Sequence, residues 1–173
     1  MKLFYKILLS LNSIMLLVVI YLVKEKIWLQ YIEKYSICIY VLTLLGITLI
    51  CILVANFLRT DVLEGGIVGV EMANDSYLPS YLGYFFVALS IPSNDLLTMG
   101  FVFAILFVFT FYSQTMYYNP LFLLFGYRFY YITKKNNMKI FVITRRKILN
   151  TENLSFNNLK RINAFTFIDK EKT

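Results

Sequence analysis

The sequence of 173 residues contains no histidine, two cysteines, three prolines and one tryptophan. The lack of histidine removes the commonest general base and the commonest metal ligand of proteins. Cys38 and Cys51 lie in one apolar run, on helix faces too far apart for a disulfide, and no CxxC metal pattern exists. We therefore predict no catalytic, cofactor-binding or metal-binding residues and expect a protein that is not an enzyme.

Charged residues are also scarce, at 16% of the chain against about 25% in ordinary soluble domains, whereas apolar residues reach 59%. The apolar residues gather in long runs, and a bilayer core of about 30 Å requires roughly 20 of them as a helix. The expected spans are residues 7–23, 35–58, 77–91 and 96–118. The sequence therefore predicts an α-helical membrane protein whose residues 1–126 form four transmembrane helices.

The first run resembles a secretory signal peptide because Lys2 and Lys6 precede its apolar core. No small-residue cleavage site follows that core, since the next residues are Lys24, Glu25 and Lys26. An uncleaved membrane anchor is therefore favoured.

The distribution of positive charge predicts the orientation of these spans. Four spans place both termini on one side of the membrane, together with fourteen of the 17 Lys and Arg residues. These fourteen are Lys2, Lys6, Arg59 and the eleven residues that follow Asn119. The three on the other side are Lys24, Lys26 and Lys34. Because cytoplasmic segments carry an excess of Lys and Arg, both termini are expected to face the cytoplasm.

The loop at residues 59–76 would then lie on the cytoplasmic side. It carries three glycines and four irregularly spaced carboxylates. The carboxylates are those of Asp61, Glu64, Glu71 and Asp75. Since they have no His or Cys partners, and since no phosphate-binding glycine motif is present, we interpret this segment as a solvated loop.

Residues 127–173 are predicted to form a small, basic cytoplasmic module rich in β-strand. The segments 127–132 and 139–144 are aromatic and β-branched, and residues 134–137 between them favour a turn, which is typical of a hairpin. A third strand is expected at residues 164–168, after a polar stretch.

This module offers a basic surface, with eleven positive and three negative residues from Arg128 onward. The candidate partner-docking residues are its densest positive points, Lys134, Lys135, Arg145, Arg146 and Lys147. Three interpretations compete: attraction to anionic lipid, docking of an acidic soluble partner, and direct nucleic-acid binding, which charge alone supports weakly.

Two segments, residues 71–86 and 118–131, combine with the spans and the basic tail into a pattern that resembles the membrane subunit of the Kiwa anti-phage defence system. The resemblance implies a bacterial inner-membrane protein, expected to form a homotetramer, that senses phage attack at the envelope. It also implies a cytosolic DNA-binding defence subunit as partner. Direct nucleic-acid binding by this chain is not expected, because charge alone supports it weakly. No functional residues are carried over from the family.

Two classes of function follow. The first is a sensor and scaffold that oligomerises in the membrane and docks the DNA-binding effector on its basic inner face. The alternative is an oligomeric channel or transporter component. Ionisable residues inside the spans would mark an ion path, but Arg59, Asp61 and Asp95 lie at span edges, which favours the first class.

Overall fold

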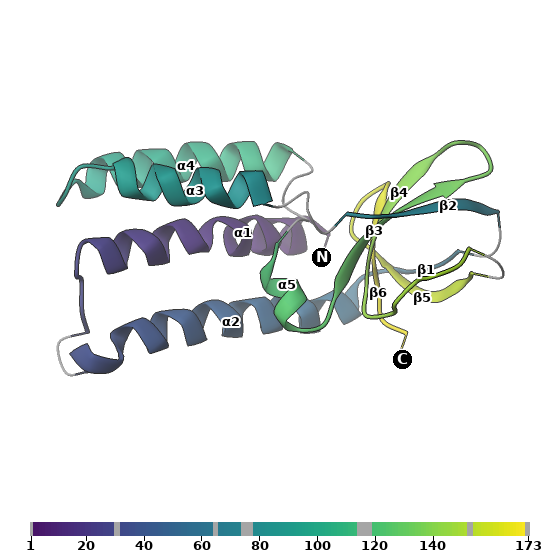
Figure 1. The fold of residues 1–173 in the computed structure, drawn as a ribbon, viewed down its shortest axis with the longest axis horizontal. Helices are drawn as coiled ribbons and strands as arrows, with labels where there is room; N and C mark the ends of the chain where they lie inside the picture. Colours follow the sequence, from purple (N-terminus) through teal and green to yellow (C-terminus); the bar gives the residue numbers. More distant parts are fainter. Residues whose placement is uncertain are drawn as a thin grey trace.

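The computed structural model describes residues 2–29, 32–63, 66–73, 78–113, 119–151 and 154–171. Four helices lie along the long axis of the molecule, and a curved β-sheet covers one end of them (Figure 1). The N-terminus lies at the end of the helices that meets the sheet.

The helical layer is built around its first helix. Its helices are α1 (Lys2–Lys24), α2 (Ser36–Val54), α3 (Leu78–Ser90) and α4 (Leu96–Tyr112). Short 3-10 helices flank α2 at Glu33–Tyr35 and Ala55–Phe57. α1 packs against α2, α3 and α4, and Figure 1 shows α2 on the side of α1 away from α3 and α4.

A tight turn joins α3 to α4. Pro92 follows α3, and the Asp95 side chain accepts a hydrogen bond of 2.9 Å from the Thr98 amide at the start of α4. This contact satisfies one of the amides that the first turn of a helix leaves unpaired. The connection is as short as the bounds of the expected spans, 77–91 and 96–118, imply.

The prediction of a four-span helical membrane protein is wrong. Among the described residues, two helices are long and apolar enough to cross a membrane: Lys2–Lys24 and the segment Glu33–Phe57. α3, which has Pro79 in its first turn and ends before Pro92, has 13 residues, and α4 has 17. At 1.5 Å per residue these helices extend about 20 and 26 Å, short of the roughly 30 Å of a bilayer core. Residues 114–118 of the fourth predicted span lie outside the described residues.

The sheet has six strands in the order β1-β5-β6-β4-β3-β2. The strands are β1 (Thr60–Leu63), β2 (Ile67–Met72), β3 (Arg128–Lys134), β4 (Lys139–Thr144), β5 (Phe156–Arg161) and β6 (Thr166–Asp169). β4 and β6 pair in parallel, and the other neighbours pair antiparallel. A short helix, α5 (Leu121–Leu124), precedes β3.

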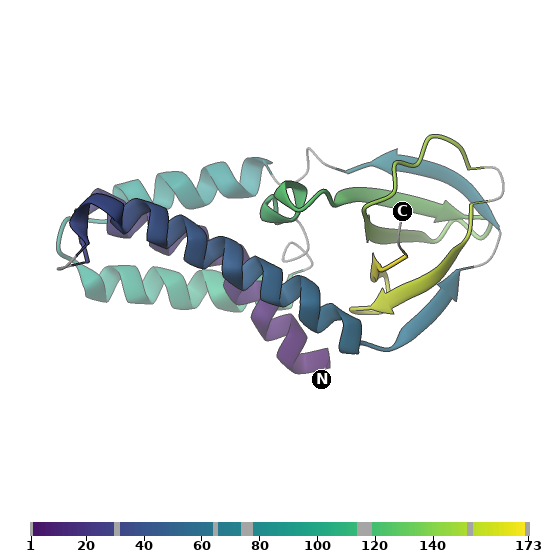
Figure 2. The ribbon, with the colours of Figure 1, turned by 90° about the horizontal axis from the view of Figure 1, so that it is seen from below.

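The sheet is strongly curved because its two edge strands are consecutive in the chain. β1 and β2 stand at opposite ends of the strand order, yet Leu63 and Ile67 are only four residues apart. An extended chain of that length reaches at most roughly 14 Å. The sheet therefore bends until its edges approach each other (Figure 2).

This curvature gives the sheet a core of its own. Tyr130 of β3 lies opposite Val142 of β4, and Ile132 lies opposite Ile140. All four side chains are buried, together with Phe156 of β5 and apolar residues of β1 and β6. Because strands from both ends of the order contribute, this core fills the concave side.

The other face of the sheet forms a joint core with the helices. Phe129 lies opposite Ile143 in the β3–β4 register, so both point away from the concave side. They pack in one buried cluster with Tyr5 and Leu9 of α1 and Ile52 of α2. Sheet and helices are therefore attached through shared apolar packing.

The prediction of a three-stranded module is also wrong, because the sheet has more strands than expected. The 127–144 hairpin is confirmed as β3 and β4, and the third expected strand corresponds to β6. β1 and β2, however, come from the segment interpreted as a solvated loop, and β5 comes from the polar stretch. The sheet thus draws strands from both sides of the predicted domain boundary at residues 126 and 127.

Candidate functional site

The five candidate docking residues fall into two groups at opposite ends of the sheet. Arg128 pairs with Thr144 at the end of the β3–β4 hairpin that meets the helices, and Thr133 pairs with Lys139 at the far end. Lys134 and Lys135, here called the distal lysines, therefore lie away from the helices. Arg145, Arg146 and Lys147 follow β4 at the near end. A strand of seven residues separates the groups by roughly 20 Å.

The distal lysines occupy the hairpin turn. The Lys134 amide donates to the Met138 carbonyl at 3.0 Å, and Asn137 has a φ of 58°, which an asparagine tolerates well. Lys135 is exposed. Within the described part of the chain, neither lysine side chain has an acidic partner. The next lysine, Lys139, differs because its Nζ lies 3.2 Å from Glu71 Oε2.

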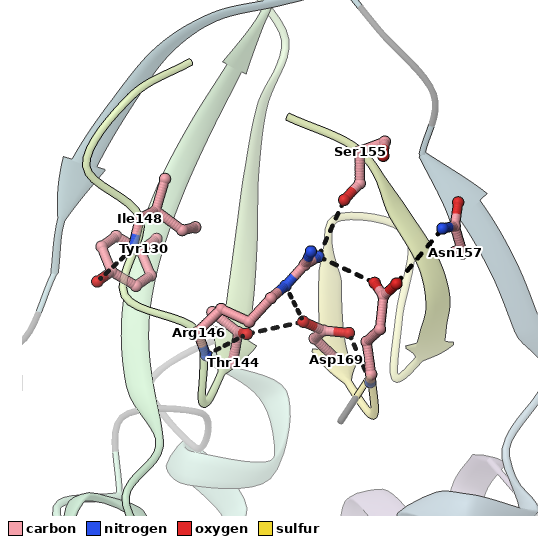
Figure 3. A network of polar contacts seen from close by, with 8 residues as sticks. Tyr130, Thr144, Arg146, Ile148, Ser155, Asn157 and Asp169 are labelled. Atoms are coloured by element: carbon pink, nitrogen blue, oxygen red, sulfur yellow. Dashed lines mark hydrogen bonds and ion pairs between the residues drawn. The ribbon is translucent and has the colours of Figure 1, made fainter. Parts of the chain in front are cut away.

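Arg146 is a structural residue at the near end. Its Nε donates to Asp169 Oδ2 at 3.1 Å, and its Nη2 lies 3.2 Å from Glu171 Oε2 and donates to the Ser155 carbonyl at 2.9 Å. Figure 3 shows this guanidinium between the carboxylates and the backbone at Ser155.

The rest of this network uses the same acid. The Thr144 hydroxyl donates to Asp169 Oδ2 at 2.7 Å, and the Arg146 amide donates to Thr144 Oγ1 at 3.0 Å. The Arg146 guanidinium also lies 4.4 Å from the centre of the Phe156 ring. The Asp169 side chain is 1% exposed, so its charge is stabilised by these neighbours rather than by water. The network ties β4, β5 and β6 together.

Arg145 and Lys147 are both exposed, but their surroundings differ. Arg145 stacks on a tyrosine, with its guanidinium carbon 4.7 Å from the centre of the buried Tyr127 ring. Tyr127 also accepts a hydrogen bond of 3.2 Å from Lys170 Nζ. The same Nζ donates to the Ile52 carbonyl in the last turn of α2 at 2.6 Å. Lys170 was not among the predicted residues, because no motif surrounds it in the sequence.

These residues line an open pocket of about 530 Å³ between the end of α2 and the sheet. We call it the junction pocket. Its lining residues are Ile52, Leu53, Asn56, Tyr127, Arg145, Asp169, Lys170 and Glu171. Partial burial, together with the positive charges of Arg145 and Lys160, lowers the pKa of Lys170 to about 8. Arg145 and Lys170 are therefore cations that repel each other across one pocket.

The acidic residues of the predicted loop are paired rather than clustered. Asp61 on β1 forms an ion pair with Arg161 on β5, and Glu71 on β2 pairs with Lys139. Glu64 and Asp75 lie outside the described residues. In the part of the chain that is described, no three His, Cys, Asp or Glu side chains come together as a metal site would require.

One polar contact stands out in the helical layer. Thr48 of α2 donates to Asn12 Oδ1 of α1 at 3.1 Å, and both residues are fully buried. Among the described residues, the Asn12 amide nitrogen has no hydrogen-bond partner. The contact fixes the rotational register of α1 against α2.

Comparison with known proteins gives one match. The family model described as Anti-phage protein KwaA matches residues 5–168. No curated protein matches the chain. No solved structure matches it either.

Proposed function

The chain belongs to the family of the anti-phage protein KwaA, which gives it an anti-phage defence role, and we propose that it acts as a membrane-embedded sensor and scaffold. In this role it anchors a cytosolic DNA-binding effector to the bacterial inner membrane and performs no chemistry itself. The resemblance to the Kiwa system supports a homotetramer as the working assembly.

The observation that carries this proposal is the poor burial of the most apolar helix. In Glu33–Phe57, 22% of the apolar window is buried, against 39% in α1. A core helix of a soluble protein would bury most of such a surface. The outward side chains of α2 include Leu42, Leu49, Ile50 and Leu53, each at least 44% exposed. Lipid or neighbouring subunits would cover these residues.

α1 and α2 form a helical hairpin. The start of α1 and the end of α2 both lie at the end of the helical layer that meets the sheet. The N-terminus and the sheet lie at the same end of the helical layer (Figure 1). That end carries Lys2, Lys6, Arg59 and the positive charges of the sheet, which supports a cytoplasmic location for both termini.

The distal lysines are the proposed docking surface for the effector. They project from the end of the sheet that is farthest from the helices, and their charge is not neutralised by described neighbours. A partner with an acidic surface would meet them without approaching the membrane. Electrostatic complementarity of this kind raises association rates and selects partners. Direct binding of nucleic acid is not proposed.

Co-purification tests the docking. The double variant Lys134→Glu and Lys135→Glu should recover several-fold less of the defence protein encoded beside this chain, while its amount in the membrane fraction is unchanged. The matched control is Lys26→Glu with Lys34→Glu, which makes the same charge change on exposed residues at the opposite end of the helices. Equal recovery from both double variants would refute docking through the distal lysines. Recovery of the unaltered chain in the soluble fraction would refute the membrane role.

A further inference from the structure

The junction pocket holds two positive side chains that lack an anion. Arg145 and Lys170 face the same space, and neither forms an ion pair with any described carboxylate. Bringing two like charges together costs free energy unless an anion joins them. We propose that the junction pocket binds the phosphate of an anionic phospholipid; the inference rests on the membrane embedding proposed above.

The carboxylates that line the pocket do not serve as these anions. Asp169 Oδ2 accepts from Arg146 and Thr144, and Asp169 Oδ1 accepts from the Glu171 amide at 3.0 Å. Glu171 lies against the same Arg146 guanidinium at 3.2 Å. Both carboxylates are thus in direct contact with Arg146, whereas Arg145 and Lys170 form no ion pair with either of them and can contact an outside anion.

The geometry of the two cations suits a phosphate. The Arg145 guanidinium lies over the Tyr127 ring and is exposed, so its N–H donors can make the paired contacts that arginine forms with phosphate. Lys170 is held in place by Ile52 and Tyr127, which use two of its three N–H donors and leave the third. At about 530 Å³, the pocket has room for a headgroup and several waters of about 30 Å³ each.

An apolar track leads from the helical layer into the pocket. Leu53 lines the pocket and is 52% exposed, and Leu49 lies one helical turn before it on the same face. Leu42 continues that face toward the far end of α2 and is 65% exposed. An acyl chain lying along this stripe would carry its phosphate to Arg145 and Lys170. This continuity favours a phospholipid over free phosphate or the backbone of a nucleic acid.

Lipid retention by the full chain tests the site. The protein is purified in a mild detergent and titrated with phosphatidylglycerol, phosphatidylcholine or diacylglycerol, and native mass spectrometry counts the lipids bound. Phosphatidylglycerol should bind most tightly and diacylglycerol least. Arg145→Gln should weaken phosphatidylglycerol binding roughly tenfold, as expected for loss of one charge-assisted contact. Arg145→Lys should restore part of the affinity.

The control is Lys34→Gln, which removes one exposed positive charge at the opposite end of the helices and should leave lipid binding unchanged. Equal affinity for the three lipids, or equal weakening by Arg145→Gln and Lys34→Gln, would overturn the site. Displacement of phosphatidylglycerol by millimolar inorganic phosphate would assign the pocket to a free anion, and displacement by a short oligonucleotide would assign it to nucleic acid. Both results would refute a lipid site. If instead the chain itself is soluble without detergent, the membrane proposal fails. This outcome can be distinguished from the results of the lipid titrations.

Discussion

The two ends of the β3–β4 hairpin carry the same kind of charge in different settings. At the distal tip, Lys135 is exposed and Lys134 is half-buried, and neither is paired with a described carboxylate. At the end that meets the helices, Arg146 is locked between Asp169 and Glu171, and Arg145 with Lys170 faces a pocket. The comparison shows that the positive charges of one basic segment have different surroundings, and we propose that they divide into docking, structural and ligand-binding charges. The following substitutions test that division.

The largest effect is expected from Arg146→Ala. The substitution leaves the nearly buried Asp169 carboxylate without its ion-pair partner and removes the contact with Ser155. We expect the free energy of unfolding to fall by about 3 kcal/mol, the lower end of the range for breaking a buried pair, because Arg146 is partly exposed. Thermal unfolding in detergent measures this. The control Lys147→Ala should change the free energy of unfolding by no more than about 0.5 kcal/mol. An equal loss of stability in both variants would contradict the structural role of Arg146.

A pH-dependent effect is expected from Lys170. Its pKa is lowered to about 8 in the folded protein, from a usual value of 10.5. Between these two values the unfolded chain binds more protons than the folded chain, so the contribution of this group to stability rises with pH from about 8 to 10.5. Lys170→Met should remove this rise from the pH profile of thermal unfolding.

An anionic lipid adds a second test to the same profile. A phosphate beside Lys170 would favour its charged form and return its pKa toward the usual value. Saturation with phosphatidylglycerol should therefore flatten the rise in the unaltered protein. A rise that persists in Lys170→Met would show that another group titrates there.

The smallest effect on stability is expected from the distal lysines. Lys134→Gln with Lys135→Gln changes no described ion pair, so the free energy of unfolding should shift by no more than about 0.5 kcal/mol. Thermal unfolding under the same detergent conditions checks this. A loss of stability comparable to that of Arg146→Ala would mean that the distal lysines stabilise the fold. The two ends of the hairpin would then not differ in the way described above.

Part of this fold could be predicted from local pattern. The β3–β4 hairpin was evident because apolar residues fill both faces of two strands around a polar turn. The helices were evident because long apolar runs contain few breakers. Their lengths were not: the predicted fourth span continued to residue 118, whereas α4 ends at Tyr112, immediately before the polar residues Ser113, Gln114 and Thr115.

The remaining strands gave weaker signals. β2 contains Ile67, Val68 and Val70, which favour a strand, but the neighbouring glycines and carboxylates suggested a loop. β5 has two buried apolar residues, Phe156 and Leu159, and is held mainly by backbone pairing with β1 and β6. Pairing between β1 and β5 joins residues about 100 positions apart, which no local pattern reveals.

The separation of Arg146 from Lys134 could not be predicted either. Both residues belong to dense positive clusters. Their roles differ because the fold brings Arg146, just after β4, into contact with Asp169, which lies 23 positions later in the chain. Lys170 was missed for the same reason, since its partners Ile52 and Tyr127 come from α2 and the start of β3. The roles of these charges depend on long-range contacts.

The placement of β1 and β2 before α3, with the other four strands after α4, has a consequence for synthesis. When the ribosome has made the first two helices, the two strands that follow have no partners, because β3 and β5 are still to be translated. The sheet can close only after α3 and α4 have also been translated, because they precede β3 in the chain. A chain truncated before β3 would therefore present unpaired strand edges to the cell's proteases.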